Sequence, residues 1–181
     1  NAVEVRLGTG TGGFGTPTTY SPGQGGLYPA AVLIGDMNGD SKPDIVTSNG
    51  LGDCVSVLLG TGMGTFPLAT VFDVGGPVAS LPAIGDVNDD GLVDLVVLTV
   101  TFKYGFSVLL GTGAGGLGAP TIFKGPLDDQ GGIALGDLNG DGHSDLIVNG
   151  PSTASVLLGT GTGSFGAPAT LKGCNSLQPP V

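Results

Sequence analysis

Short apolar runs recur along the chain, each bounded by glycine, proline or acidic residues. Examples are residues 31–34 (AVLI), 95–98 (LVVL) and 133–135 (IAL). They are apolar at nearly every position, and no segment has a helical period. Such runs are typical of strands covered on both faces. The pattern therefore predicts an all-β protein.

The runs repeat with a period of about fifty residues. Each period predicts four antiparallel strands. The first precedes an aspartate-rich loop (31–34), the second follows the loop directly (94–98), the third ends in Val-Leu-Leu (56–59), and the fourth follows a Gly-Thr turn (119–123). A repeat of about fifty residues that forms four strands is typical of the blades of a β-propeller.

The third-strand motif Val-Leu-Leu-Gly-Thr-Gly occurs at 57–62, 108–113 and 156–161, and a variant of it stands at 5–10 with no loop ahead of it. This variant predicts a half-blade made only of third and fourth strands. The predicted organisation is a half-blade, three full blades and a C-terminal tail, at residues 1–23, 24–75, 76–126, 127–173 and 174–181.

Three and a half blades cannot close a ring alone, because closed propellers have about four to eight. We expect the missing surfaces to come from a longer chain or from other copies of this one. The first residue, Asn1, is consistent with a processed product or an excised piece. If copies meet head to tail and the rotation does not close, the product is a filament.

The loop between the first two strands carries oxygen-bearing side chains at alternate positions, as calcium loops do. Residues 137–145 read Asp-Leu-Asn-Gly-Asp-Gly-His-Ser-Asp, and residues 36–44 and 86–94 follow the same pattern. Positions 1, 3, 5 and 9 offer side-chain oxygens, and position 7 offers a backbone carbonyl. The predicted ligands of three structural Ca²⁺ ions are Asp36, Asn38, Asp40, Lys42, Asp44, Asp86, Asn88, Asp90, Leu92, Asp94, Asp137, Asn139, Asp141, His143 and Asp145.

A single loop of this kind could equally be an Asx-rich turn that binds nothing, but three copies favour calcium. The first loop departs most from the pattern, because Ser41 replaces the glycine at position 6. Ser41 must then adopt a backbone conformation that glycine takes more easily, so we expect this site to bind less tightly.

The net charge of −10 has its origin in these loops, because nine of the fifteen acidic residues are the aspartates at their positions 1, 5 and 9. Three Ca²⁺ ions would reduce the net charge to about −4. The five basic residues are scattered, which argues against a nucleic-acid partner. No apolar run approaches the roughly 20 residues of a membrane helix. Because such loops fill readily at millimolar calcium, an extracellular location is expected.

Together, the D-x-N-x-D-G-x-x-D loop and the S-V-L-L-G-T-G-x-G-x-F-G-x-P run resemble the FG-GAP/VCBS repeat family. The resemblance covers nearly the whole chain, except residues 172–181. It implies a calcium-binding β-propeller like the integrin α-subunit head, in which the metal loop joins the first two strands of each blade. It also implies adhesion or recognition of protein or carbohydrate. The Phe-Gly pair is retained at 14–15 and 165–166 but not in the middle copies.

No catalytic constellation accompanies the loops, so we expect a non-enzymatic module. We expect the only histidine, His143, to face solvent, the glycine-rich segment 8–15 to be a hairpin turn, and the recurring Phe14, Phe66 and Phe165 to pack between blades. Aromatic residues off the repeat register are candidates for ligand contact: Tyr28, Phe102, Tyr104 and Phe106.

Two cysteines, Cys54 and Cys174, could form a disulfide within one chain or between two, or remain buried thiols. The sequence leaves two functions open. The first is an extracellular recognition module with structural calcium. The alternative is a structural subunit that assembles into a fibre or oligomer through its incomplete blade.

Overall fold

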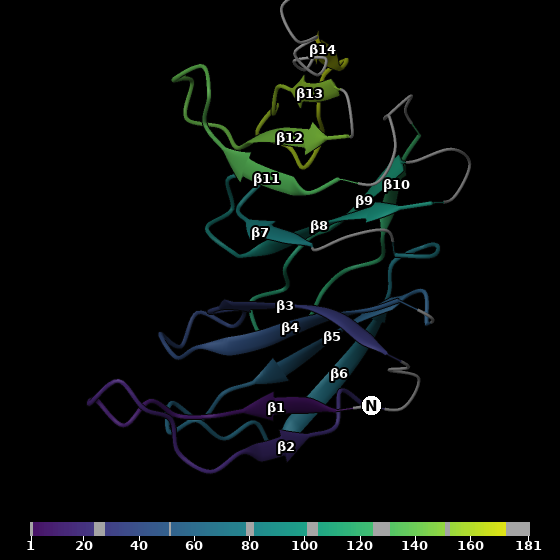
Figure 1. Cartoon of the computed structure of the whole chain (residues 1–181). Coiled ribbons are helices and arrows are strands. Elements are labelled where there is room, and N and C mark those ends of the chain that lie inside the picture. The colour runs from purple at the N-terminus through teal and green to yellow at the C-terminus, as the bar shows by residue number, and fades with distance from the viewer. Residues whose placement is uncertain are drawn as a thin grey trace, which may run out of the picture.

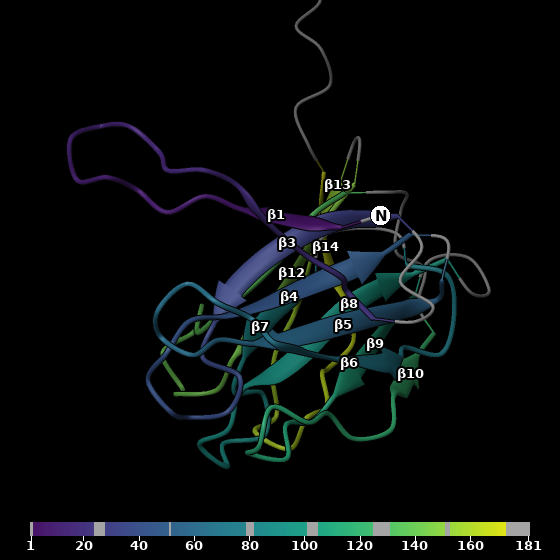
Figure 2. The same ribbon diagram turned by 90° about the horizontal axis from the view of Figure 1, so that it is seen from below.

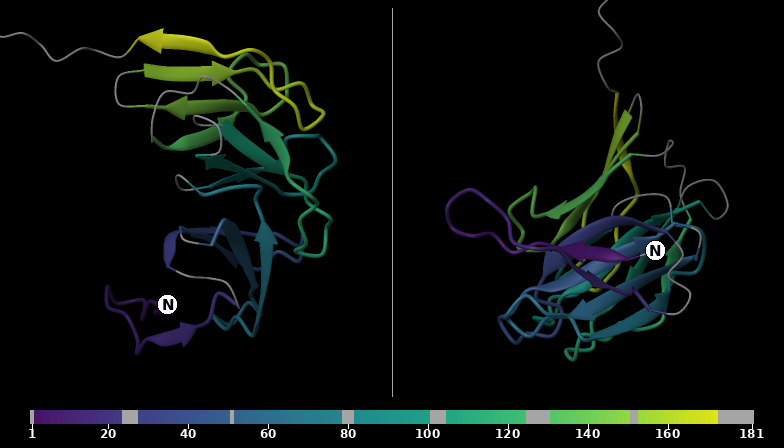
Figure 3. Two further views of the ribbon diagram at one scale, coloured as in Figure 1. Left: turned by 90° about the vertical axis from the view of Figure 1, so that its right-hand side faces the viewer. Right: turned by 60° about the horizontal axis from the view of Figure 1, so that its bottom comes forward.

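A computed structural model describes residues 2–23, 28–50, 52–78, 82–100, 105–124, 131–150 and 153–172. Within these ranges the protein is all-β, as predicted. Its sheets stack in chain order, with the half-blade at one end and the last blade at the other (Figure 1). Viewed from the side, the stack curves but does not close into a ring (Figure 3).

One two-stranded sheet and three four-stranded sheets make up this stack. The half-blade consists of β1 (Val3–Val5) and β2 (Thr18–Tyr20). Blade 1 consists of β3 (Pro29–Gly35), β4 (Asp44–Asn49), β5 (Cys54–Leu59) and β6 (Leu68–Asp73). Blade 2 consists of β7 (Ala83–Gly85), β8 (Asp94–Thr99), β9 (Gly105–Leu109) and β10 (Thr121–Phe123). Blade 3 consists of β11 (Ile133–Gly136), β12 (Asp145–Asn149), β13 (Thr153–Leu157) and β14 (Ala169–Lys172).

Within each sheet the strands pair antiparallel in sequence order. This arrangement confirms the prediction of three full blades and a half-blade that do not close within one chain. The proposed domain boundaries between the blades stay a prediction.

Both faces of the second and third strands are buried in blade 1, which explains why these strands are apolar at consecutive positions. On β4, Ile45 packs toward the half-blade, whereas Val46 packs toward blade 2. Neighbouring side chains alternate in this way because the side-chain period of a strand is two. A continuous apolar run is therefore the signature of a sheet covered on both sides.

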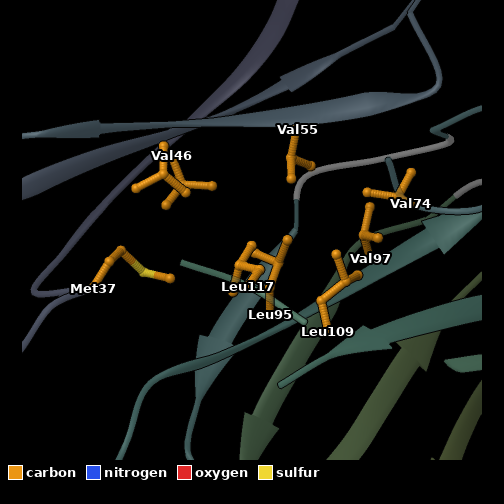
Figure 4. Packing of buried hydrophobic residues seen from close by; sticks show 9 residues of the cluster. Met37, Val46, Val55, Val74, Leu95, Val97, Leu109 and Leu117 are labelled. Carbon is orange, nitrogen blue, oxygen red and sulfur yellow. The ribbon is translucent and has the colours of Figure 1, made fainter. Parts of the chain in front are cut away.

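The cores of the protein lie between blades rather than within them. Between blades 1 and 2, Val46 and Val55 face Leu95 and Val97 across the gap between the sheets, and Met37 of the first loop joins them (Figure 4). A second cluster joins blades 2 and 3, and a smaller one joins the half-blade to blade 1. Each blade is therefore stabilised mainly by its neighbours.

One contact recurs at every interface between neighbouring sheets. The leucine after the third strand, or at its end, reaches a glycine in the next blade's Gly-Thr turn: Leu7 reaches Gly64, Leu59 reaches Gly115 and Leu110 reaches Gly163. A Cβ on these glycines would lie 2.5, 2.5 and 3.0 Å from the leucine side chain, and all three have positive φ. The repeated glycine is thus required both by backbone conformation and by the leucine that packs on it.

Segment 8–15 is a hairpin turn, as predicted. Gly8 bridges to Phe14, and the backbone N–H of Thr9 donates to the carbonyl of Gly13. The connection from β1 to β2 projects well beyond the stack (Figure 2). Phe14 is 72% exposed, so its prediction as a packing anchor is wrong, because the turn that carries it extends past blade 1.

Phe66 and Phe165, in contrast, pack between sheets as predicted. Phe66 is buried against the half-blade and meets Tyr20 edge-on with ring centroids 5.4 Å apart. Phe165 packs on the cluster between blades 2 and 3.

Cys54 is buried at the start of β5, where the side-chain amide of Asn49 donates to its Sγ at 3.5 Å. Cys174 lies outside the described residues, so the disulfide stays a prediction.

Candidate metal centre

The three aspartate-rich loops lie between the first and second strands of blades 1, 2 and 3. Loop 1 is residues 36–44, loop 2 is residues 86–94 and loop 3 is residues 137–145, and positions are counted from the first aspartate of each. All three lie at the same end of their sheets because each connects equivalent strands. Their internal hydrogen bonds repeat almost unchanged from one loop to the next.

The aspartate at position 1 fixes the turn of each loop. Its carboxylate accepts from the backbone N–H of position 6 at 2.7 Å for Asp36 and Ser41, 2.8 Å for Asp86 and Gly91, and 3.0 Å for Asp137 and Gly142. In loop 1 the other oxygen accepts from the N–H groups of Gly39 and Asp40, at 2.8 and 3.1 Å. Position 1 therefore orders the loop around its own carboxylate.

Two further hydrogen bonds, accepted by the side chains at positions 3 and 5, stabilise the conformation of each loop. The asparagine oxygen at position 3 accepts from the N–H of position 5 at 3.1, 3.3 and 2.9 Å in loops 1, 2 and 3. The aspartate at position 5 accepts from the N–H of position 7 at 2.9, 2.8 and 2.9 Å. The side chains at positions 1, 3 and 5 thus all turn back toward the loop backbone.

The aspartate at position 9 differs from the others, because it is fully buried in all three loops. One oxygen accepts from the N–H of position 2: Asp44 from Met37 at 2.9 Å, Asp94 from Val87 at 2.8 Å and Asp145 from Leu138 at 2.9 Å. The other accepts from the first glycine of the Gly-Thr-Gly motif: Gly60 at 2.7 Å, Gly111 at 2.7 Å and Gly159 at 2.8 Å. Position 9 therefore fastens the loop to the turn that follows the third strand.

The electrostatics of the two kinds of carboxylate differ accordingly. Burial raises the pKa of the Asp94 carboxyl, while its bonds from Gly111 and Val87 oppose that shift. At the exposed position 5, a hydrogen bond from the Lys42 side chain lowers the pKa of Asp40, and the bond from the His143 N–H lowers the pKa of Asp141.

Loop 1 contains a cation of its own. The Lys42 ammonium lies 2.9 Å from Oδ2 of Asp40, and the pair is largely exposed. A metal ion in loop 1 would have to displace this ammonium or bind beside it. The calcium-loop pattern assigns a role only to the backbone carbonyl of Lys42, so it gave no sign of this side-chain contact.

Ser41 has a φ of 62°, which confirms the backbone conformation expected of it, while weaker binding at loop 1 stays a prediction. The glycines at the same position in loops 2 and 3 have φ of 81° and 91°. Position 4 also requires positive φ, and Asp89 adopts 60° there, where loops 1 and 3 have glycine. Non-glycine residues are uncommon in this region, so Ser41 and Asp89 are held by their loops.

His143 does not simply face solvent, which corrects the prediction. Its Nδ1 lies 2.6 Å from Oδ2 of Asp89, so the pair links loop 3 to loop 2. A Cβ on Gly161 would collide with Oδ2 of Asp89, and only a glycine leaves room for this pair. The contact joins residues far apart in sequence with no repeat counterpart, so no motif could have revealed it.

The donor chemistry of the loops suits a hard cation, because each offers carboxylate and amide oxygens and no sulfur. Within the described ranges, however, no three His, Cys, Asp or Glu side chains are gathered closely enough to form a preformed metal site. Each carboxylate oxygen has about two lone pairs, and apart from Oδ1 of Asp36, which accepts from two, none of these oxygens accepts from more than one backbone N–H in the described loops. The backbone of each loop is therefore already ordered by its hydrogen bonds, but the carboxylates would have to rotate to coordinate an ion.

The aromatic residues predicted to contact a ligand differ in how exposed they are. Tyr28 is exposed, but Phe106 is buried and stacks on Phe123 with ring centroids 4.7 Å apart. Phe106 is thus a core residue, and its prediction as a ligand contact is wrong. Phe102 and Tyr104 lie outside the described residues.

Residues 86–148 match the family described as FG-GAP-like repeat. The chain carries an FG-GAP-like repeat. The match begins at the first aspartate of loop 2 and ends in β12, so it contains loops 2 and 3 and the strands between them. It confirms the resemblance on which the fold prediction partly rested.

Among solved structures, the chain is similar to a lectin from Agrocybe aegerita, described as specifically recognising non-reducing terminal N-acetylglucosamine. The TM-score is 0.62 at 24% sequence identity. The match covers 94% of this chain but only 46% of the lectin, so the chain spans less than half of that protein. A search of the curated proteins finds no match. In the part of the chain that the structure describes, no helix is long and apolar enough to cross a membrane.

Proposed function

We propose that this chain is a non-enzymatic recognition module that functions outside the cytoplasm and is stabilised by calcium. The observation that carries the proposal is the threefold repetition of one loop geometry, with the same hydrogen bonds at positions 1, 3, 5 and 9. A solvated turn has no need to repeat such detail at fixed places in successive blades. The FG-GAP-like repeat supports the same function.

In this proposal the exposed carboxylates at positions 1 and 5 supply most of the charge that attracts each ion. The asparagine at position 3 and the backbone carbonyl at position 7 add neutral oxygens. The buried carboxylate at position 9 keeps the loop attached to its blade and offers its remaining lone pairs. Bound calcium would cancel the repulsion among the acidic side chains of each loop.

We propose a carbohydrate as the ligand of this module. Support comes from the lectin that shares its fold over 94% of this chain. Of the two candidate aromatic residues that the structure describes, Tyr28 is the exposed one, and its ring could stack on a sugar ring. Because the chain spans less than half of that lectin, the position of the sugar site is not carried over.

Thermal unfolding with increasing Ca²⁺ tests the calcium proposal. A site filled at 100 times its Kd stabilises the folded state by about 2.7 kcal/mol, so chelation with EDTA should lower the Tm by several degrees or more. The matched control is the double variant Asp137→Asn/Asp141→Asn, which keeps the side-chain volume but removes two charges from loop 3. It should bind one ion fewer by isothermal titration. An identical melting curve in Ca²⁺ and EDTA would contradict the proposal.

A glycan array probed with the calcium-loaded chain tests the ligand proposal. Selective binding to glycans ending in N-acetylglucosamine, lost in Tyr28→Ala, is the expected result. Uniform background over the array would refute carbohydrate recognition by this chain while leaving the calcium proposal intact.

Self-assembly into a fibre or oligomer is the second candidate, favoured by apolar side chains left bare at the last blade. Leu138 is 52% exposed at position 2 of loop 3, whereas Met37 and Val87 are buried at that position by the next blade. Electron microscopy in millimolar calcium tests this candidate, and filaments would support it. Only monomers at high concentration would exclude it.

A further inference from the structure

Two contacts between blades join loop 2 to loop 3. The first is the pair of His143 and Asp89, whose Nδ1 and Oδ2 atoms lie 2.6 Å apart. The second is a backbone hydrogen bond, in which the N–H of Gly163 donates to the carbonyl of Val87 at 2.9 Å. Val87 and Asp89 are positions 2 and 4 of loop 2. Blade 3 therefore holds the residues on both sides of position 3, a candidate calcium ligand.

Both contacts are also connected to the candidate ligands of loop 3. His143 is position 7, which offers its backbone carbonyl, and its N–H donates to Oδ1 of Asp141 at position 5, at 2.9 Å. Gly163 belongs to the Gly-Thr turn of blade 3, residues 159–166. The first N–H of this turn donates to Oδ1 of Asp145 at position 9, at 2.8 Å. A change in the conformation of loop 3 therefore reaches loop 2 by two separate routes.

Loops 1 and 2 lack this connection, although blades 1 and 2 also pack on each other. Position 4 of loop 1 is Gly39, which has no side chain, and position 7 of loop 2 is Leu92, whose side chain has no polar atom. Among the backbone hydrogen bonds of the described residues, none joins Gly115, the counterpart of Gly163, to loop 1. The interface between blades 1 and 2 is therefore an internal control for the interface between blades 2 and 3.

We infer that these two contacts couple calcium binding at loops 2 and 3, so that each loop binds its ion more tightly when the other is filled. The inference rests on the calcium proposal above and adds how its sites act together. Coordination by Asp141 and by the carbonyl of His143 would fix the imidazole that contacts Asp89. Loop 2 then loses less conformational freedom when its own ligands are ordered, which is a positive coupling. The coupling is reciprocal between loops 2 and 3, and loop 1 binds independently.

Each loop has its own reporter for a test of this coupling. The backbone N–H at position 6, which belongs to Ser41, Gly91 or Gly142, donates to the position-1 carboxylate of its loop. That carboxylate must rotate to coordinate an ion, so the amide NMR signal at position 6 should shift when its own loop is filled. A titration of the full isotope-labelled chain with Ca²⁺ alone then gives one binding curve for each loop.

The double variant Asp137→Asn/Asp141→Asn tests whether loop 3 assists loop 2. It should weaken binding at the Gly91 reporter by about fivefold, at the lower end of the usual coupling between sites. Because the loss of two nearby charges also weakens binding, the same substitutions are repeated in a His143→Ala chain, which keeps every side-chain ligand and the carbonyl at position 7. There the Gly91 curve should shift by much less. Equal shifts in the two backgrounds, or no shift in the natural background, would overturn the inference.

The interface between blades 1 and 2 allows the converse experiment. The double variant Gly39→Asp/Leu92→His places the same pair of side chains between loops 1 and 2. A Cβ on Gly39 would meet nothing within 4 Å, and Asp89 shows that position 4 accommodates an aspartate at a φ of 60°. The side chain of Leu92 already lies over the glycine equivalent to the one beneath His143. The transplanted pair should therefore couple loop 1 to loop 2.

The substitutions Asp86→Asn/Asp90→Asn, which remove two charges from loop 2, measure this new coupling. Binding at the Ser41 reporter should weaken by more in the chain with the transplanted pair than in the chain with the natural residues at 39 and 92. A Ser41 response that is the same in both chains would contradict the role of the pair.

The calcium proposal and the coupling fail in different ways. If no reporter shifts in millimolar Ca²⁺, the calcium proposal is refuted and the coupling with it. If all three reporters shift but the Gly91 curve does not respond to the loss of loop 3, the calcium sites exist and the coupling alone is refuted.

Discussion

The aspartates of each loop divide into two kinds, and their contacts separate the two roles that one motif combines. The carboxylates at positions 1 and 5 accept hydrogen bonds only from within their own loop, where in loops 1 and 2 those bonds are exposed. The carboxylate at position 9 is fully buried and joins the loop to the turn after the third strand. The same side chain thus serves as a candidate cation ligand in two places and as an architectural anchor in the third.

Replacing one aspartate of each kind gives the largest expected contrast. Asp94→Ala leaves the N–H groups of Val87 and Gly111 without their acceptor, and each unsatisfied group costs about 1–3 kcal/mol. We expect the free energy of unfolding in EDTA to fall by about 3 kcal/mol. Asp90→Ala, at the exposed position 5, should cost less than about 0.5 kcal/mol in urea unfolding. An equal loss of unfolding free energy in the two variants would contradict the separate roles of positions 5 and 9.

The variant Lys42→Gln tests whether a candidate cation ligand, Asp40, becomes more available when its own ion pair is removed. Lys42 pairs with Asp40 and so competes with any ion for that carboxylate. Removing the ammonium should strengthen calcium binding at loop 1 and lower its Kd, because the carboxylate of Asp40 would no longer be shared with Lys42. Isothermal titration resolves the effect if the ions of loops 2 and 3 bind first. An unchanged or weaker Kd would show that Lys42 does not compete.

Ser41→Gly tests how much strain loop 1 carries relative to loops 2 and 3. Ser41 has φ of 62°, where its counterparts are glycines. Relief of this conformation, less the added freedom of glycine in the unfolded chain, should stabilise the protein by about 0.5 kcal/mol. The comparison Gly142→Ser in loop 3 should shift the midpoint of urea unfolding in the opposite direction. A loss of stability in Ser41→Gly would mean that the serine side chain makes a contact worth more than its strain.

The smallest expected effect concerns His143, which links loop 3 to loop 2 through Asp89. Because both side chains are partly exposed, His143→Ala should cost about 0.5 kcal/mol or less near neutral pH. A double-mutant cycle with Asp89→Ala isolates the pair. A coupling energy indistinguishable from zero would leave the two loops independent.

Much of the fold could be predicted because each repeat forms a blade whose strands are buried in the same way between neighbouring blades. Continuous apolar runs such as residues 95–98 identified strands covered on both faces, and β8 is buried throughout. The missing first and second strands at the N-terminal end followed from the solitary motif at 5–10, and β1 and β2 form the two-stranded sheet that it predicts.

The candidate site could be predicted less completely. Alternating oxygens identified the loops, but position 9 was interpreted only as a ligand, because its second partner lies 14–17 residues away in the turn after the third strand. The pair of Asp89 and His143 spans 54 residues and depends on how two blades stack. Interactions between blades carry no signal in a single-sequence motif, whereas interactions within a loop do.

The leucine that packs on a glycine at each interface has a consequence for how such a chain changes over evolutionary time. Leu7, Leu59 and Leu110 all meet an equivalent glycine in the sheet that follows. A gene duplication that inserts one whole repeat therefore creates two junctions that already fit, with no compensating substitution. A deletion of one repeat likewise joins two surfaces that were complementary beforehand. Repeat number can therefore vary more readily than the sequence of any single interface.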